Sequence, residues 1–199
     1  VGLVNACNPA QAVSQATHLA SLIQVQEAGF CQDGAAVIAA AVSSACKDDA
    51  TIKTILDDAI KYLPLNSGER MSKAINQALA WADEYREYRS FREHAYSCSK
   101  EFFQLAKNNS LETVPLTLAL FKIAKGDLEK SVTYAANFGR DTDTMAAMVG
   151  AIAGAFGSDD IIKPRWKVKI EANTDHDQQT MALRLSQAAI IKLDTEQAA

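Results

Sequence analysis

The chain has little of what most often identifies a function from sequence alone. It has four cysteines and three histidines among 199 residues, and no two cysteines stand in a C-x-x-C spacing. We therefore expect reduced, mostly buried thiols, and neither a zinc site nor a disulfide framework. Neither sign of charge dominates, because 20 basic residues face 24 acidic ones. No basic face for nucleic acid is predicted.

Long apolar runs are also absent. The smoothest stretch is interrupted by Gly150 and Gly154 and is too short for a transmembrane helix. The first residues lack the charged, apolar and small-residue layout of a signal peptide. We expect no membrane segment and a cytoplasmic protein.

Strand-like alternation of polar and apolar residues is missing, and helical spacing takes its place. The sequence is 48% apolar with only nine Gly and four Pro, which allows a sizeable core. Apolar residues recur three and four positions apart, as in Val13, Ala16, Ala20 and Ile23. The sequence predicts an all-α fold, a compact multi-helix bundle whose single domain includes residues 1–199.

Several helix limits can be predicted. Asp33, Ser110 and Asp127 are expected to cap helix starts, and Pro164 is expected in a turn. Residues 69–114 contain neither Gly nor Pro, which is long for one globular helix, so we expect a break within 90–99 or at 108–110. Within this stretch, residues 83–94 mix charged and aromatic side chains. They are interpreted as a solvated helix face, in preference to a surface that stacks on adenine or binds a partner.

The most informative segment is Asn137-Phe-Gly-Arg-Asp-Thr-Asp-Thr144, which leads into the small-residue run 145–156. Asp and Thr are weak inside helices and favoured at helix starts, so this cluster is expected at a helix N-terminus. Carboxylate and hydroxyl oxygens suit hard cations such as Mg²⁺, Ca²⁺ or Mn²⁺. A metal site is one hypothesis. The other is a single N-cap followed by solvated first-turn residues that favour the helix dipole.

The same segment carries a family resemblance, together with neighbouring stretches. Residues 112–121 (ETVPLTLALF), 125–129 (KGDLE), 137–144 (NFGRDTDT) and 150–155 (GAIAGA) resemble the C-terminal part of the ADP-ribosylglycohydrolase family. The resemblance implies that Asp141, Asp143 and Thr144 bind a pair of divalent metal ions, Mg²⁺ or Mn²⁺. Arg140 differs from the second Gly that many members have here, which affects the expected shape of the sugar pocket.

Substrate contacts are implied by the resemblance as well. Family members carry a Thr-His pair early in a helix, and Thr17-His18 resembles it. His18 would then line the ADP-ribose cleft, and the alternative is a histidine on a helix surface. With His18, the resemblance assigns Gly139 and Arg140 to substrate binding.

The implied reaction is hydrolysis of the glycosidic bond between ADP-ribose and an acceptor, with ADP-ribose or an ADP-ribosylated protein as the partner. Members of the family begin with a Gly-Asp and a Thr-Asp-Asp-Thr motif, and neither stands at the start of this chain. We therefore expect a C-terminal portion, inactive alone, whose site is completed by an N-terminal chain or fragment. The catalytic acid or base is expected there. The alternatives are a non-catalytic module that binds ADP-ribose or is structural, and a stable proteolytic core whose partner fragment stays bound.

Overall fold

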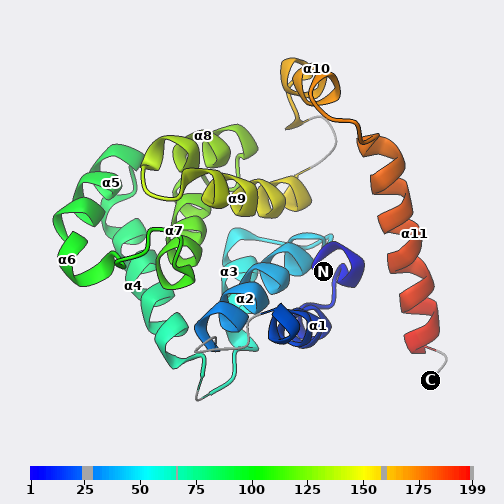
Figure 1. Ribbon diagram of the computed structural model, residues 1–199, viewed down its shortest axis with the longest axis horizontal. Helices are drawn as coiled ribbons and strands as arrows, with labels where there is room; N and C mark the ends of the chain where they lie inside the picture. The colour runs from blue at the N-terminus through cyan, green and yellow to red at the C-terminus, as the bar shows by residue number, and fades with distance from the viewer. Residues whose placement is uncertain (24–28, 66, 158–160, 198–199) are drawn as a thin grey trace.

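The computed structural model describes residues 1–23, 29–65, 67–157 and 161–197 (Figure 1). Within these ranges the chain forms helices and no strand, which confirms the predicted all-α fold. In chain order the elements are η1 (Leu3–Asn5), α1 (Pro9–Ile23), α2 (Gly29–Ala45), α3 (Ile52–Lys61), α4 (Glu69–Tyr85), α5 (Tyr88–Ser97), α6 (Ser99–Phe102), α7 (Ser110–Ile123), α8 (Leu128–Phe138), α9 (Thr142–Phe156), α10 (Pro164–Ala172) and α11 (Gln178–Gln197).

Helix α7 lies at the centre of the molecule. Its residues 111–121 are buried without interruption, and it packs against α2, α4, α8 and α9. A helix that is apolar on nearly every side must be surrounded by other elements. The Thr117 hydroxyl lies in this apolar environment and donates a hydrogen bond to the Thr113 carbonyl oxygen at 2.7 Å. Glu112 is the one charged residue of the run, and it is fully buried.

The other helices form pairs around α7. Helix α1 packs against α2, α2 against α3 and α9, and α8 against α9. In Figure 1, α10 and α11 lie to one side of this body. Helix α11 contacts η1 and exposes Leu183, Ile190 and Ile191. In the part of the chain that the structure describes, no helix is both long and apolar enough to cross a membrane.

Two of the predicted helix starts are wrong and one is confirmed. Asp33 lies inside α2, which begins at Gly29. The side chain of Asn109 caps α7 by accepting a hydrogen bond from the Leu111 N–H at 2.9 Å. The Ser110 hydroxyl instead donates to the Phe30 carbonyl oxygen at 3.1 Å, a tertiary contact. Asp127 caps α8 as predicted, accepting from the Lys130 N–H at 2.8 Å.

The helix breaks between 69 and 114 are only partly where the sequence predicts them. A break at Cys98 and a loop before Ser110 match the expectation. The first break comes earlier, because α4 ends at Tyr85 and Arg86 takes a left-handed φ of 51°. The segment 83–94 is therefore no continuous solvated face, and Phe91 within it is fully buried.

Pro164 begins α10 as its first residue, where its missing N–H costs nothing, so the predicted turn is wrong.

Candidate functional site

The predicted metal cluster lies at the junction of α8 and α9. Helix α8 ends at Phe138, and Gly139 follows with φ 94° and ψ 178°, a combination open to glycine and hardly to other residues. The Phe138 carbonyl oxygen accepts hydrogen bonds from Tyr96 Oη at 3.1 Å and from Arg92 Nε at 2.7 Å. A Cβ at Gly139 would stand 2.2 Å from Tyr96 Oη. Glycine therefore lets the chain turn closely beneath α5.

The side chain of Arg140 holds the loop in place immediately after Gly139. Its Nε donates to Glu112 Oε1 at 2.6 Å, and its Nη2 donates to Glu112 Oε2 at 2.8 Å. The same Nη2 donates to the Gln104 carbonyl oxygen at 2.6 Å, and the guanidinium lies 4.9 Å from the ring centre of Phe103. The hydrogen bond to Glu112 raises the pKa of Arg140 above its ordinary value, although burial opposes this. The bidentate pair is the strong form of such an interaction.

Glu112 is satisfied on both oxygens. In addition to Arg140, its Oε2 accepts a hydrogen bond from the Gln104 N–H at 2.8 Å. The buried carboxylate thus connects helix α7, the segment before it and the α8–α9 junction. The predicted substrate contact of Arg140 stays a prediction. In the structure the Arg140 side chain forms this ion pair, which sets the direction of the backbone that leads to Asp141.

Asp141 occupies the N-cap position of α9, but its side chain makes no capping hydrogen bond. The residue is only 8% exposed, and its Oδ2 is buried without a hydrogen-bond partner among the described residues. Ionised carboxylates are costly to bury unless something positive or a donor satisfies them. The arrangement therefore favours the cation-binding hypothesis over the simple capping one for this residue.

Asp143 and Thr144 follow in the first turn of α9, and both are exposed. Asp141 and Thr144 are three positions apart and so lie on the same side of the turn. These oxygen donors fit a hard divalent cation. They would form only part of a coordination shell, since no three His, Cys, Asp or Glu side chains of the described residues are grouped to hold a metal ion.

Thr144 is one of the residues that line a groove of about 640 Å³. Met148 and Ala151 of α9, Ile38 of α2 and Leu19 of α1 contribute to its mostly apolar lining. His18 is exposed on α1, next to Leu19, and is not among the lining residues. The structure thus brings α1 and the start of α9 to one groove. The roles predicted for His18, Gly139, Arg140, Asp141, Asp143 and Thr144 stay predictions.

The sequence reasoning missed the part played by Glu112. A signal was present, because Glu112 is the single charge in the run Leu111–Phe121, and a charged residue in a buried helix requires a partner. Tyr96 and Arg92, which hold the Phe138 carbonyl oxygen, carry no comparable signal. Their contacts join positions 42 and 46 residues apart.

Comparison with known proteins gives several matches. The chain is 36% identical to the uncharacterized protein YegU of Escherichia coli (strain K12) over 38% of its length and 23% of the relative. It is 27% identical to ADP-ribosylhydrolase ARH3 of Gallus gallus over 77% of this chain and 46% of the relative. With ADP-ribosylhydrolase ARH3 of Danio rerio the identity is 44% over 26% of this chain and 14% of the relative.

The chain therefore spans less than half the length of each of these curated relatives. No solved structure gives a significant match. The family model described as ADP-ribosylglycohydrolase matches residues 1–194, which include the α8–α9 junction and the groove beside it. On this match the chain belongs to the ADP-ribosylglycohydrolase family.

Proposed function

We propose that this chain supplies part of the active site of a hydrolase that releases ADP-ribose from ADP-ribosylated acceptors. The observation that carries the proposal is the Asp141 carboxylate, which is buried at a helix start with one oxygen unpartnered. Membership of the ADP-ribosylglycohydrolase family supports the reaction class. Two of the relatives are named ADP-ribosylhydrolases, which agrees with it.

In this proposal Asp141, Asp143 and Thr144 would hold two divalent metal ions, Mg²⁺ or Mn²⁺. Such ions supply Lewis acidity and lower the pKa of a bound water when they are present. The residues of the chain position the site. Gly139 keeps the loop close to Tyr96, and the ion pair between Arg140 and Glu112 fixes the approach to Asp141. His18 and the backbone at 139–140 would contact the substrate. We assign no catalytic acid or base.

A second polypeptide segment is part of the proposal, because three oxygen-donor side chains do not complete a two-metal shell. That segment would carry the Gly-Asp and Thr-Asp-Asp-Thr motifs that the family resemblance calls for. Its place would be the groove beside Thr144, whose lining includes Leu19 and Ile23, exposed to 48% and 78%. An apolar rim of this kind is typical of a surface that another segment covers.

Manganese binding tests the metal assignment directly. Free Mn²⁺ is titrated by electron paramagnetic resonance against the chain and its Asp141→Asn and Asp127→Asn variants. Asp127 is the matched control, because it also occupies a helix N-cap but has its carboxylate satisfied by the Lys130 N–H. We expect Asp141→Asn to weaken Mn²⁺ binding at least about tenfold and Asp127→Asn to leave it unchanged. Equal binding by all three proteins would contradict the assignment.

The reaction is tested with the completed site. The chain is mixed with a family segment that carries the Gly-Asp and Thr-Asp-Asp-Thr motifs, and release of free ADP-ribose from an ADP-ribosylated protein is followed. We expect activity that requires both polypeptides and is lost in Asp141→Asn. Binding of ADP-ribose without any release would favour the non-catalytic ADP-ribose-binding module instead.

A further inference from the structure

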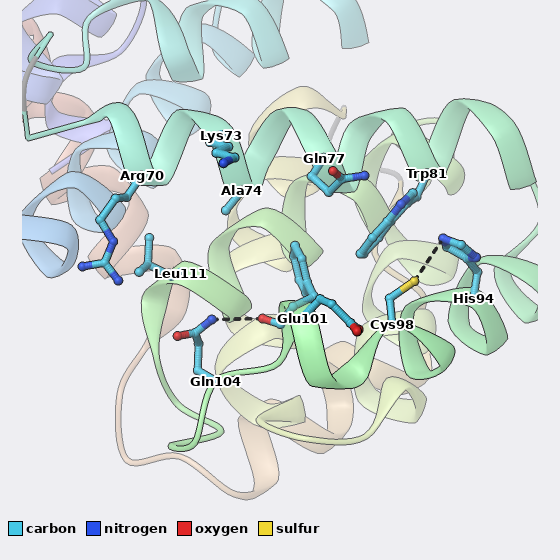
Figure 2. Close-up of a pocket in the computed structure, with 11 residues that line it drawn as sticks. Arg70, Lys73, Ala74, Gln77, Trp81, His94, Cys98, Glu101, Gln104 and Leu111 are labelled. Carbon is cyan, nitrogen blue, oxygen red and sulfur yellow. Dashed lines mark hydrogen bonds between the residues drawn. The ribbon is translucent and has the colours of Figure 1, made fainter.

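A second cavity, of about 650 Å³, lies between α4, α5, α6 and the start of α7 (Figure 2). None of the residues predicted to bind metal or substrate lines it. Its volume falls in the range of small-molecule sites. The function proposed above uses no residue of its wall except Gln104, and that one only through its backbone.

One wall of this cavity is a single stripe of helix α4. Arg70, Lys73, Ala74, Gln77 and Trp81 line it, and their spacing of three and four residues places them on one helix face. Figure 2 shows Arg70 toward one end of this face and Trp81 toward the other. At a rise of 1.5 Å per residue, the two positions are about 16 Å apart along the axis. The wall therefore changes from cationic to aromatic along its length.

Among the residues that the structure describes, the cationic end has no acidic partner. Neither Arg70 nor Lys73 forms an ion pair in the part of the chain that the structure describes. Arg70 lies over the ring of Phe30 with its guanidinium 5.8 Å from the ring centre, which restricts its direction. Glu101 also lines the cavity but forms an ion pair with neither cation. Two adjacent cationic side chains at the end of a cavity attract an anionic group.

The aromatic end is held rigid by its own contacts. The His94 ring stacks on Tyr85, with centres 4.4 Å apart, and meets the Trp81 ring edge-on at 5.0 Å. Its Nε2 lies 3.5 Å from the Cys98 Sγ, as the dashed line in Figure 2 shows. Trp81 also packs against Phe102 at 4.8 Å. These rings need no rearrangement to receive an apolar or aromatic group.

Gln104 forms a third, equally fixed part of the wall. Its side-chain Nε2 donates to the Phe102 carbonyl oxygen at 3.0 Å. Its backbone is held from both sides, since the N–H donates to Glu112 and the carbonyl oxygen accepts from Arg140. Contacts of Trp81 with His94 and Phe102, and of Gln104 with Phe102 and Glu112, therefore connect the parts of the cavity wall to one another.

We propose that this cavity binds an elongated organic acid. Its carboxylate would lie between Arg70 and Lys73, and its aromatic or aliphatic body would extend along Ala74 and Gln77 to Trp81. The length of the α4 stripe sets the length of the ligand, and the position of the two cations sets its direction. The proposal rests on the cavity alone and does not depend on the hydrolase function proposed above.

The test ligand is 6-phenylhexanoate. Two comparison ligands, 6-phenylhexanol and 6-phenylhexylamine, share its phenylalkyl chain but end in a hydroxyl and an amine. Binding to the full chain is measured by titration calorimetry. We expect the acid to bind at least about tenfold more tightly than the alcohol, because only the acid satisfies both cations. The amine should bind most weakly. Equal affinity for acid and alcohol, or no binding of the acid at millimolar concentration, would overturn the proposal.

Location is tested by chemical protection. Iodoacetamide alkylation of Cys98 is followed by peptide mass analysis with and without the acid, and the exposed Cys7 serves as an internal reference. We expect the acid to slow alkylation of Cys98 and not of Cys7. Equal slowing at both cysteines, or none at Cys98, would show that the acid binds elsewhere.

Two double variants complete the design. Arg70→Gln with Lys73→Gln removes the cationic end, and Lys167→Gln with Lys169→Gln removes the same charge from exposed positions on α10. All four side chains are exposed, so both proteins should fold. We expect the first to lose about tenfold in affinity for the acid and the second to bind like the parent. Equal affinity of the two variants would contradict the assignment of the carboxylate.

Discussion

The guanidinium of Arg140 and the carboxylate of Glu112 form a two-point ion pair across 28 residues of sequence, with N···O distances of 2.6 and 2.8 Å. Glu112 is fully buried, whereas the Arg140 side chain is 24% exposed. Arg140 also has a left-handed φ of 70°, which costs about 1 kcal/mol in a residue other than glycine. The ion pair thus holds an unfavourable backbone conformation immediately before Asp141.

Removing the arginine charge should destabilise the fold strongly. We expect Arg140→Met to lower the free energy of unfolding by about 3 kcal/mol, because it leaves the buried Glu112 carboxylate without its cation. The free energy of unfolding is measured by urea denaturation, with circular dichroism as the signal. Arg89→Met, at an exposed position on α5, is the control and should change little. Adding Glu112→Gln to Arg140→Met should recover part of the lost stability, because it removes the unpaired buried charge. No recovery would show that this charge is not the cause of the loss.

The Asp141 carboxylate should reduce stability when no cation is present. Its Oδ2 is buried without a partner among the described residues, so Asp141→Asn should be more stable than the parent in EDTA, by about 1 kcal/mol, and should melt at a higher temperature. Thermal denaturation with and without Mn²⁺ measures this. Mn²⁺ should raise the melting temperature of the parent and not of the variant. A variant less stable than the parent in EDTA would show that the carboxylate is satisfied in the fold.

The sequence predicts the helical fold and the helix start at 141–144, because both depend on local patterns. Apolar spacing identifies α1, and the short polar residues at 141–144 identify the N-terminus of α9. Asp127 caps α8 for the same local reason. Features of this kind depend only on residues within one or two helical turns of each other.

The remaining features depend on contacts between distant segments. Arg86 ends α4 in a left-handed conformation without a glycine to mark it. Ser110 has the residue type of an N-cap, but its hydroxyl bonds to Phe30, 80 residues away. The pairing of Glu112 with Arg140 joins α7 to the α8–α9 junction. Local propensity does not encode these partners, and the geometry of the candidate site depends on one of them.

Gly139 should tolerate no side chain. Its φ of 94° disfavours other residues, and a Cβ would stand 2.2 Å from Tyr96 Oη. We expect Gly139→Ala to lower the free energy of unfolding by about 2 kcal/mol, measured by urea denaturation. Combining it with Tyr96→Phe removes the clashing oxygen and should restore part of this loss, leaving the backbone strain. If the two changes are simply additive, the clash is not the cause.

The ion pair that Asp58 forms with Lys47, at 2.7 Å, should give the protein a specific sensitivity to acid. Burial alone would raise the pKa of Asp58, but hydrogen bonds from Lys47 and Ser44 outweigh it and lower that pKa below its ordinary value of 3.8. Because the folded-state pKa is the lower one, protonation favours the unfolded chain. The stabilisation is therefore present above about pH 4 and is lost as the pH falls through the folded-state value.

We expect Asp58→Asn to lower the free energy of unfolding by about 1 kcal/mol at pH 7. The difference from the parent should narrow as the pH falls from about 5 to about 2, since the parent loses the same interaction there. Urea midpoints measured across this range give the difference at each pH. Asp57→Asn is the control, because Asp57 pairs with Lys53 on the exposed face of the same helix, where an ion pair contributes little. A deficit in Asp58→Asn that stays constant with pH would mean that packing or the hydrogen bond to Ser44, and not the charge, is what Asp58 contributes.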